Sequence, residues 1–320
     1  MKEAGGYFQL ELNKGGYHYH DTPYVTKSGR ASLHHILAHT KPALVYIPFY
    51  TCDTLLEPFK SANIEYRFYS IDSSLDPDPS IELKPGEYLL YINYFGLKGN
   101  TVAALSGKYA DRLIVDCTRA FFMKGNGRSW FFNACRKFFG VPDGSYLYAP
   151  AGVNMILPDE RNENYVTEHL LKRFNGHTLE GYPFFVQNEL LAGKGVSRIS
   201  LLSEYLLSGI DYDEVIKQRL ANYNYLHTKF GSNNRLQFTP AGNEVSMSYP
   251  LLLDKVINKA DMATTGLFIP TFWNDTNNRG IDGFEFEKSI TGHLCPIPID
   301  HRYTTADMEA IYNSFIRFIQ

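Results

Sequence analysis

The sequence predicts an α/β protein with a large, mostly parallel sheet and a smaller α+β lobe at its C-terminal end. Short apolar runs alternate with amphipathic helical segments through the first half of the chain. That alternation is typical of parallel strands joined by crossover helices. The chain has 320 residues, more than one compact core usually holds, so we expect two domains, at 1–210 and 211–320.

The composition is that of an ordinary globular protein. Hydrophobic residues make up 44% of the chain and charged residues 20%, which are common values for folded domains. The formal net charge of −3 provides no electrostatic footprint for nucleic acid, so we expect no nucleic-acid partner. Aromatic residues reach 15%, which favours either an aromatic core or pockets and interfaces lined with rings.

Targeting and metal-binding signals are also missing from the sequence. The first residues contain no apolar stretch of the signal-peptide kind, and no run approaches the roughly 18 apolar residues that a membrane span needs. Four irregularly spaced cysteines without a C-x-x-C pair indicate reduced thiols in a cytoplasmic protein. The pairs His18/His20 and His34/His35 lack the cysteines or carboxylates that would complete a metal site, so we expect no metal and no membrane contact.

The first 148 residues predict the elements of the large sheet in order. Residues 1–27, rich in glycine and tyrosine, indicate an irregular arm. A helix is expected to begin at Ser28, because Leu33, Ile36 and Leu37 follow at helical spacing. The remaining elements are strands at 43–47, 65–71, 87–92, 112–115 and 144–148, helices at 53–62 and 101–110, and a proline-rich loop at 73–85.

The second half of the chain predicts mainly helices. Residues 165–174 and 189–191 are expected to be helical or mixed, and we place the domain boundary near Gly209, between two helices. Thr304, followed three residues later by Asp307, indicates the start of a C-terminal helix. The expected elements are helices at 199–207, 212–230, 255–264 and 304–319, and strands at 245–253 and 267–269.

Lys137 is the first candidate for chemistry, because it stands in an aromatic, apolar run. Phe131 and Phe132 precede it, and Phe138 and Phe139 follow directly. Burial of a lysine in such surroundings disfavours its ammonium form, and a neutral lysine amine can react with a carbonyl. The alternative interpretation is a lysine that extends its charge out of an apolar patch into water.

Other candidates lie where strands end and where a helix begins. Tyr50, Asn93 and Asp116 each follow or end a predicted parallel strand, and ligands of parallel sheets bind beyond those ends. The turn at Ser28 and Gly29 opens a helix, whose free amide groups can bind an anion. Each feature also has a plain structural interpretation, as a helix cap or a turn residue.

Together these features match the needs of pyridoxal phosphate. The phosphate of this cofactor is bound well by a helix N-terminus, and its ring can stack on an aromatic side chain. A carboxylate beside the pyridine nitrogen keeps that nitrogen protonated, and a lysine amine holds the aldehyde. Asp116 and Lys137 supply the last two groups, so we expect pyridoxal phosphate as the cofactor.

The order of these motifs resembles that of the DegT/DnrJ/EryC1/StrS aminotransferase family. The matching segments are Ser28-Gly29-x-Ala31-x-Leu33, Ile47-Pro48-Phe49-Tyr50-Thr51-Cys52, Tyr94-Phe95-Gly96, Val115-Asp116-Cys117, Arg136-Lys137 with Gly140-Val141-Pro142-Asp143-Gly144, Ser197-Arg198-Ile199-Ser200, and Cys295-Pro296-Ile297-Pro298-Ile299. The resemblance implies fold type I, with a large, mostly parallel, seven-stranded α/β/α domain and a small α+β C-terminal domain.

The resemblance also implies a role for each matching residue. Lys137 corresponds to the Schiff-base lysine, Asp116 to the partner of the pyridine nitrogen, and Tyr50 to the ring that stacks on the cofactor. Ser28, Gly29 and Arg30 correspond to the phosphate-binding turn, and we expect Asn93 and Arg119 among the cofactor-binding residues. Family members are homodimers with the site at the interface, and Arg198 falls in a segment that approaches the neighbour's site.

Three positions depart from the family pattern. Arg119 stands where Gln or His is usual, Phe132 where a phosphate-binding serine is common, and Val196 where an asparagine often stands. These departures concern the binding of phosphate and of the sugar nucleotide, and they leave the pair of Lys137 and Asp116 intact.

The resemblance implies transfer of an amino group from an amino acid, with glutamate expected, to a keto-sugar that is expected to be nucleotide-linked. A lyase or dehydratase of the same family ranks second, because the dehydratases carry histidine in place of the lysine. A non-catalytic member that binds a cofactor or another ligand is a third alternative. A nicotinamide-dependent enzyme is disfavoured, because no G-x-G-x-x-G motif follows the first strand.

The aromatic run at 182–185 could line an acceptor pocket, the core or a dimer interface.

Overall fold

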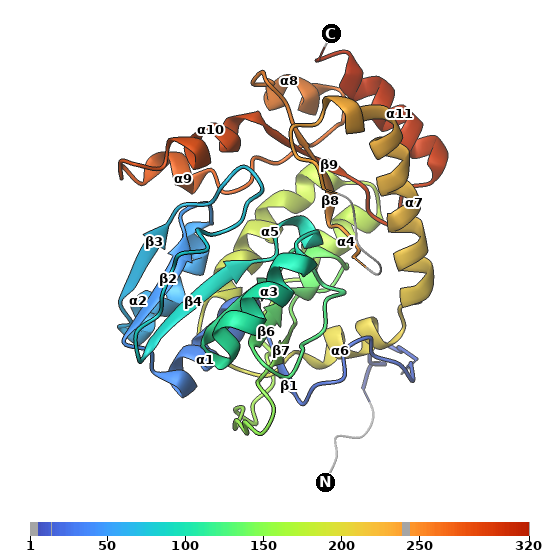
Figure 1. The fold of residues 1–320 in the computed structure, drawn as a ribbon. Helices are drawn as coiled ribbons and strands as arrows, with labels where there is room; N and C mark the ends of the chain where they lie inside the picture. The colour runs from blue at the N-terminus through green and yellow to red at the C-terminus, as the bar shows by residue number, and fades with distance from the viewer. Residues whose placement is uncertain (1–5, 14, 239–243, 320) are drawn as a thin grey trace.

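A seven-stranded sheet forms the centre of the molecule (Figure 1). The computed structural model describes residues 6–13, 15–238 and 244–319. The spatial order of the strands is β1-β7-β6-β5-β4-β2-β3, in which β2 to β6 run parallel and β7 pairs antiparallel with both β6 and β1. The strands are β1 (Tyr24–Thr26), β2 (Leu44–Pro48), β3 (Tyr66–Tyr69), β4 (Glu87–Ile92), β5 (Leu113–Cys117), β6 (Trp130–Asn133) and β7 (Ser145–Tyr148).

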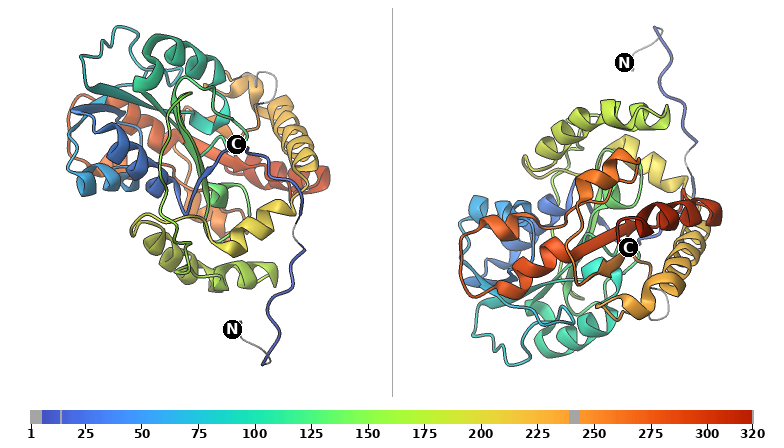
Figure 2. Two further views of the ribbon diagram at one scale, coloured as in Figure 1. Left: turned by 90° about the horizontal axis from the view of Figure 1, so that it is seen from below. Right: turned by 90° about the horizontal axis from the view of Figure 1, so that it is seen from above.

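Helices cover both faces of this sheet, as the views along its edge show (Figure 2). Helices α1 (Gly29–Thr40) and α2 (Glu57–Ala62) pack together on one face, and α3 (Gly99–Tyr109) lies on the other. Right-handed crossovers require this division, because the chain moves one way across the sheet through α1 and α2 and the opposite way through α3. The helical pair α4 (Glu168–Phe174) and α5 (Thr178–Ala192) follows β7, and α5 lies beside the start of α1.

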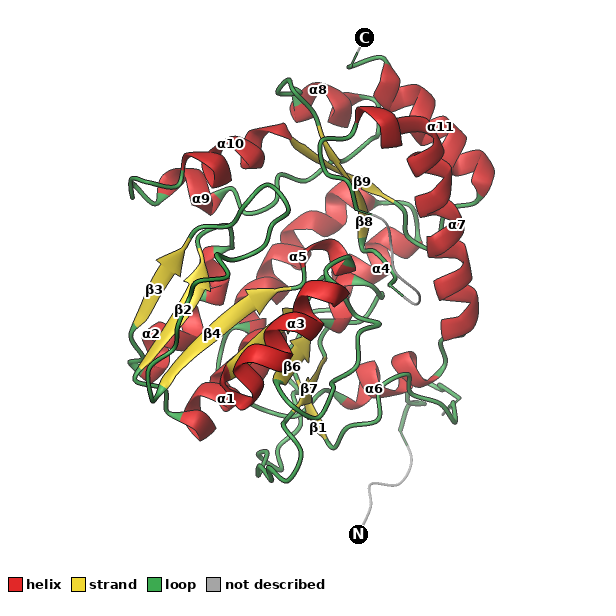
Figure 3. Ribbon diagram, viewed as in Figure 1, coloured by secondary structure: helices red, strands yellow, loops and turns green. Residues whose placement is uncertain are grey.

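The C-terminal part of the chain builds a smaller lobe around a two-stranded antiparallel sheet (Figure 3). Its strands are β8 (Ser248–Leu252) and β9 (Leu294–Pro298), paired from Ser248 with Pro298 to Leu252 with Leu294. Helix α6 (Leu201–Ser208) leads to the long helix α7 (Tyr212–Phe230), which packs against α11 (Thr305–Ile316). The remaining helices are α8 (Lys259–Thr264), α9 (Asp275–Asn278) and α10 (Glu285–His293).

The predicted architecture is confirmed: a large, mostly parallel seven-stranded α/β sheet with helices on both faces and a small α+β lobe. The capping box expected at Thr304 and Asp307 is also present. We propose the boundary between the two lobes at 210/211, between α6 and α7. None of the helices in the described residues is long and apolar enough to span a membrane.

One expected strand is absent, and several elements were not predicted, β6 and β1 among them. Residues 267–269 do not form a strand: Leu267 and Ile269 are buried, but Gly266, with φ of 83°, and Pro270 bound the segment and leave it irregular. The apolar residues 130–133 form strand β6, which the sequence analysis treated only as the surroundings of Lys137. The arm of residues 1–27 contains β1, which the sequence analysis did not predict.

Candidate active site

A cavity of about 210 Å³ opens beyond the carboxyl ends of the parallel strands, beside the start of α1. We call it the Lys137 cavity. Six of the eight predicted site residues line it, together with groups that the sequence analysis did not select. The predicted residues at its wall are Ser28, Gly29, Arg30, Asp116, Arg119 and Lys137, and the further ones include Phe132, Arg136, Glu189, Phe272 and Trp273.

Lys137 ends a short 3₁₀ turn, Cys135–Lys137, that follows β6. Cys135 and Phe138 are buried on either side of the turn, whereas Lys137 itself is exposed, because it extends into the open cavity. The protein walls of the cavity desolvate the Lys137 ammonium and lower its pKa, and the charge of Glu189 opposes this shift. The amine is therefore held by an anchored turn and is more readily deprotonated than an ordinary lysine.

Asp143 fixes the loop that carries Lys137. Its buried carboxylate accepts hydrogen bonds from the Ser200 amide at 2.9 Å, the Ser200 hydroxyl at 2.6 Å and the Asn162 side chain at 2.8 Å. Ser200 also caps α6, so one carboxylate joins the lysine loop to the start of that helix. A buried carboxylate satisfied in this way is costly to remove, so these hydrogen bonds anchor the loop.

Asp116 lies near the end of β5, in the middle of the sheet, where it pairs with Ile92 of β4 and Phe132 of β6. Its carboxylate is buried at the wall of the cavity and accepts a hydrogen bond of 2.7 Å from the Thr118 amide. Burial raises the pKa of Asp116, and the Thr118 hydrogen bonds, Arg119 and Lys137 only partly offset that effect. A cationic ring nitrogen placed here would lower this pKa again, because it would pair with the buried charge.

The first turn of α1 forms a further part of the wall. The Ser28 side chain accepts a hydrogen bond from the Ala31 amide at 3.2 Å and donates one to the Ala192 carbonyl at 2.8 Å. A Cβ atom on Gly29 would lie 3.1 Å from the Asn133 carbonyl, so glycine permits the close approach of the helix to β6. The first amides of a helix have no partner within it, which makes this turn a suitable site for an anion.

The Arg30 side chain points to carboxylates rather than into open space. Its guanidinium lies 2.7 Å from Glu57 and donates at 2.5 Å to the main-chain carbonyl of Glu189. Arg30 therefore fastens α1 to α2 and α5, and its contribution to anion binding would be the backbone amide.

Tyr50 and Asn93 lie outside the lining of the cavity, contrary to expectation. Tyr50 is fully buried, stacks on Tyr94 with a centroid distance of 5.9 Å, and meets the edge of Trp273 at 4.6 Å. Asn93 accepts a hydrogen bond from the Lys98 amide at 3.0 Å, and its amide group points to the sulfur of Met123. Trp273 covers Tyr50, so the aromatic rings at the wall of the cavity include Trp273, Phe272 and Phe132 instead.

Arg119 connects the two lobes at the cavity. Its guanidinium carbon lies 3.6 Å from the centre of the Phe272 ring and 5.0 Å from that of Trp273, within cation–π range of both. Burial lowers the pKa of Arg119 to about 10, so it stays charged at neutral pH. Trp273 has a φ of 53°, in the left-handed region that bulky residues rarely adopt. Such backbone strain is held in place by surrounding contacts.

Glu189 is the charged group at this site that the sequence analysis did not select. Its carboxylate lies 2.7 Å from Arg136 and 3.9 Å from Arg30. Burial alone would raise the pKa of Glu189, but Lys137, Arg136 and Arg30 outweigh it and bring the value to about 2. The only signal in the sequence was the polar run Gln187-Asn188-Glu189 between the apolar residues 183–186 and 190–192.

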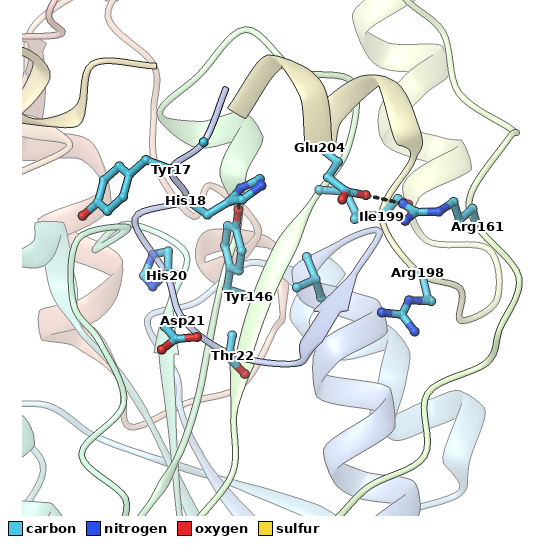
Figure 4. Close-up of a pocket in the computed structure, with 12 residues that line it drawn as sticks. Tyr17, His18, His20, Asp21, Thr22, Tyr146, Arg161, Arg198, Ile199 and Glu204 are labelled. Carbon is cyan, nitrogen blue, oxygen red and sulfur yellow. Dashed lines mark hydrogen bonds and ion pairs between the residues drawn. The ribbon is translucent and has the colours of Figure 1, made fainter. Parts of the chain in front are cut away.

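Arg198, expected to approach a neighbour's site, lines a different cavity of about 490 Å³ beside the N-terminal arm. Figure 4 shows it there with His18, Tyr146 and the ion pair of Arg161 with Glu204, which is 2.5 Å long. This arm cavity and the Lys137 cavity share no lining residue. Arg198 is therefore not part of the Lys137 site of its own chain.

The residues present fit pyridoxal phosphate better than a metal ion. The Lys137 cavity combines an amine, a buried carboxylate and the open first turn of a helix, the three groups that hold the aldehyde, ring nitrogen and phosphate of that cofactor. The described part of the chain contains no cluster of three histidine, cysteine, aspartate or glutamate residues able to hold a metal ion.

Comparison with known proteins finds similarity of fold and not of sequence. No family model matches the chain, and no curated protein matches it. The fold is that of the pyridoxal-phosphate-dependent aminotransferases, and in particular of the DegT/DnrJ/EryC1/StrS and sugar aminotransferases, which confirms the resemblance at the level of fold.

Three solved structures illustrate this similarity. The DegT DnrJ EryC1 StrS aminotransferase from Brucella abortus is 12% identical, with a TM-score of 0.61, over 92% of this chain and 85% of that one. The sugar aminotransferase CalS13 from Micromonospora echinospora is 13% identical, with a TM-score of 0.62, over 91% and 86%. NtdA from Bacillus subtilis, with bound cofactor PMP, is 11% identical, with a TM-score of 0.64, over 92% and 73%.

Proposed function

We propose that this protein is a pyridoxal-phosphate-dependent aminotransferase that transfers an amino group from an amino acid, glutamate, to a nucleotide-linked keto-sugar. The observation that carries the proposal is the convergence of Lys137, Asp116 and the first turn of α1 on one cavity. The similar fold of solved sugar aminotransferases supports the reaction class and the sugar acceptor.

The residues of the cavity divide the work between binding and proton transfer. The first turn of α1 would hold the phosphate with its free amides, and Asp116 would keep the ring nitrogen protonated. Phe272 and Trp273 line the same cavity and would exclude water from a bound ring. When bound, the pyridoxal ring withdraws electrons from the bond to the substrate carbon that reacts. Lys137 would hold the aldehyde of the cofactor, and its amine, when free, would take the proton from the substrate Cα as a general base.

The lowered pKa of Lys137 suits this role, because an amine that acts as a base near neutral pH must lose its proton easily. Glu189 limits that shift, since its negative charge favours the ammonium form. The two opposing effects keep Lys137 able both to accept a proton and to give it back.

Spectroscopy of the protein purified with pyridoxal phosphate tests the proposal. We expect the long-wavelength absorption of a lysine-bound cofactor in the wild type, its loss on addition of glutamate, and no such absorption in Lys137→Ala. Because Lys137 is exposed in the cavity, the variant should keep the thermal stability of the wild-type apoprotein. We expect turnover of the variant to fall by about 10³-fold or more, since it loses both the covalent bond and the general base.

Absorption that no amino donor changes would contradict aminotransfer and favour the lyase or the non-catalytic alternative. Absence of absorption in the wild type would contradict cofactor binding as well.

We also propose a cytoplasmic homodimer in which Arg198 lies near the site of the partner subunit. The four free cysteines support the cytoplasmic location. The pair α4–α5 supports the homodimer, because it exposes a large apolar surface. Leu171, Phe174, Leu179 and Leu190 are each more than half exposed on these two helices, and exposed apolar surface of this kind is typical of protein interfaces. Light scattering of the purified protein should give twice the chain mass of 36.5 kDa.

A further inference from the structure

Helix α9 joins two segments that meet at the Lys137 cavity. Residues 271–273, which we call the cover, line the cavity and come just before this helix, and Arg279 comes directly after it. Helices α9 and α10 lie over the C-terminal ends of β2 and β3 (Figure 1). The loop after β2, residues 49–53, contacts α9 and leads into the wall of the cavity. Contacts between α9 and this loop therefore decide how closely the cover lies on the cavity.

Arg279 holds the loop with its whole guanidinium group. Nη1 donates to the Phe49 carbonyl, Nη2 to the Thr51 carbonyl at 2.6 Å, and Nε to the Asp53 carboxylate at 2.9 Å. The side chain is only 6% exposed, and its guanidinium carbon lies 5.2 Å from the centre of the Phe49 ring and 5.1 Å from that of Phe68. Arginine suits this position, because its planar fork can bind several acceptors together, whereas a lysine ammonium is a compact point charge.

The same loop is held on its other side by the cover and by α9 itself. Trp273 meets the edge of the buried Tyr50 ring at 4.6 Å, and the Asp275 carboxylate accepts a hydrogen bond from the Asp53 amide at 3.1 Å. Trp273 has the left-handed φ of 53°, and such a conformation persists only where surrounding contacts hold it. Arg279 and Asp275 supply contacts of this kind at the two ends of the short helix that follows Trp273.

Helix α10 has its own attachment to the large lobe. The Ile71 amide donates to the buried Glu287 carboxylate at 2.8 Å, and Phe284, just before the helix, stacks on Phe49 with a centroid distance of 3.9 Å. Neither contact passes through Arg279. Loss of the Arg279 contacts should therefore loosen α9 and the cover, while α10 stays attached.

We propose that Arg279 is a positioning residue for the Lys137 site. By fastening α9 to the loop after β2, it holds Phe272 and Trp273 against the cavity and limits both the entry of water and the release of a bound molecule. This inference rests on the proposed function in one respect only: it takes the bound molecule to be pyridoxal phosphate.

Tryptophan fluorescence of the apoprotein tests the position of the cover without any cofactor. The chain contains two tryptophans, so Trp130→Phe leaves Trp273 as the single reporter and Trp273→Phe leaves Trp130, in β6. We expect Arg279→Gln to raise the constant for quenching of Trp273 by acrylamide by about 3-fold or more, because loss of charged hydrogen bonds favours the open cover. Quenching of Trp130 should not change, whereas a general loosening of the fold would expose both tryptophans.

Release of pyridoxal phosphate from the holoenzyme gives the readout at the site itself. We expect the release rate to rise by about 10-fold in Arg279→Gln. Arg279→Lys keeps the charge but loses the planar fork, so its release rate should lie between those of the wild type and Arg279→Gln. Arg235→Gln is the matched control: Arg235 belongs to the same lobe, but its pair with Asp254, at 3.5 Å, lies on the surface, so both readouts should match the wild type.

A second variant is needed because Arg279 is largely buried and its replacement can disturb folding. Asp275→Ala, in a half-buried position, removes only the acceptor for the Asp53 amide and should raise the quenching of Trp273 by about 1.5- to 2-fold. If the quenching of Trp273 keeps its wild-type value in every variant that folds, or if Trp130 becomes accessible to the same extent, Arg279 does not position the cover.

The outcomes separate this inference from the proposed function. If the wild type shows the glutamate-sensitive absorption but Arg279→Gln changes neither the quenching of Trp273 nor the release of the cofactor, the positioning role is wrong and the function stands. If Arg279→Gln exposes Trp273 alone in a protein that never takes up pyridoxal phosphate, the positioning role stands and the function is wrong.

Discussion

The two sides of the Lys137 cavity are built in different ways. On the side of the large sheet, Asp116 and Lys137 closely follow or end a strand, and Ser28 caps the helix beside them. On the opposite side, Thr271 to Trp273 come from an irregular segment of the small lobe, and Glu189 comes from the last turns of α5. Under the proposed function, the first side holds the groups that would react or bind, whereas the second side covers the cavity and contributes the charge of Glu189.

This difference teaches how each side can change. Groups at strand ends are positioned by the sheet, so a substitution there alters the chemistry and leaves the fold intact. Groups on the covering side are positioned by contacts between distant segments, so a substitution there alters stability and closure. Three predictions test that distinction.

The largest effect on stability is expected for Trp273→Ala. Trp273 is 6% exposed and packs on Tyr50, Tyr94 and Phe95, so removal of its ring should lower the free energy of unfolding by about 3–5 kcal/mol. Trp273→Gly is the matched control: it removes the same ring but accepts the left-handed φ of 53° without strain. We expect Gly to be more stable than Ala by about 1 kcal/mol in denaturant titrations. Equal stability of Trp273→Ala and the wild type would show that the two lobes do not pack here.

An intermediate effect is expected for Glu189→Gln. The pKa of Glu189 is about 2 in the folded protein, below its ordinary value of 4.5. The ionised form therefore stabilises the fold fully above pH 4.5, and this contribution is lost as the pH falls toward 2. The variant should be about 2–3 kcal/mol less stable at pH 7, and its stability should depend less on pH between 4.5 and 2.

Glu180→Gln provides the control for this prediction. Glu180 pairs with Lys172 at 2.7 Å on the exposed surface of the same helix as Glu189, and its loss should change stability little. If both variants behaved alike in acid titrations, the interactions of Glu189 with Lys137 and Arg136 would not be the cause.

The smallest effect on stability, and of opposite sign, is expected for Asp116→Asn. Burial raises the pKa of Asp116, so the folded state disfavours the charge, and the contribution of this group to stability is lost as the pH rises above 3.8. At pH 7 the neutral variant should therefore match or exceed the thermal stability of the wild-type apoprotein. Turnover should nevertheless fall by about 10- to 100-fold, because a charged hydrogen bond to the ring nitrogen is lost. Parallel loss of stability and activity would contradict the assignment of Asp116 to the chemical side.

Much of the fold could be predicted because its signals are local. The runs at 43–47, 87–92 and 112–115 are short, apolar and bounded by turn residues, and each corresponds to a strand of the sheet. The run at 267–269 has the same appearance but forms no strand, because burial alone selects apolar residues whether or not a neighbouring strand is available. Strand β6 is the reverse case, an apolar run that does form a strand. It was not predicted, because its apolar residues were interpreted only as the environment of Lys137.

The sequence by itself determined the chemical side of the site. Order along the chain and position at strand ends are local properties, and in a parallel sheet they bring Asp116, Lys137 and the start of α1 to one edge. Only the tertiary structure decided what covers that edge. Trp273 instead of Tyr50 reaches the cavity, and Glu189 comes to it from a helix later in the chain. Such contacts depend on how the two lobes pack, and no local pattern of residues records that packing.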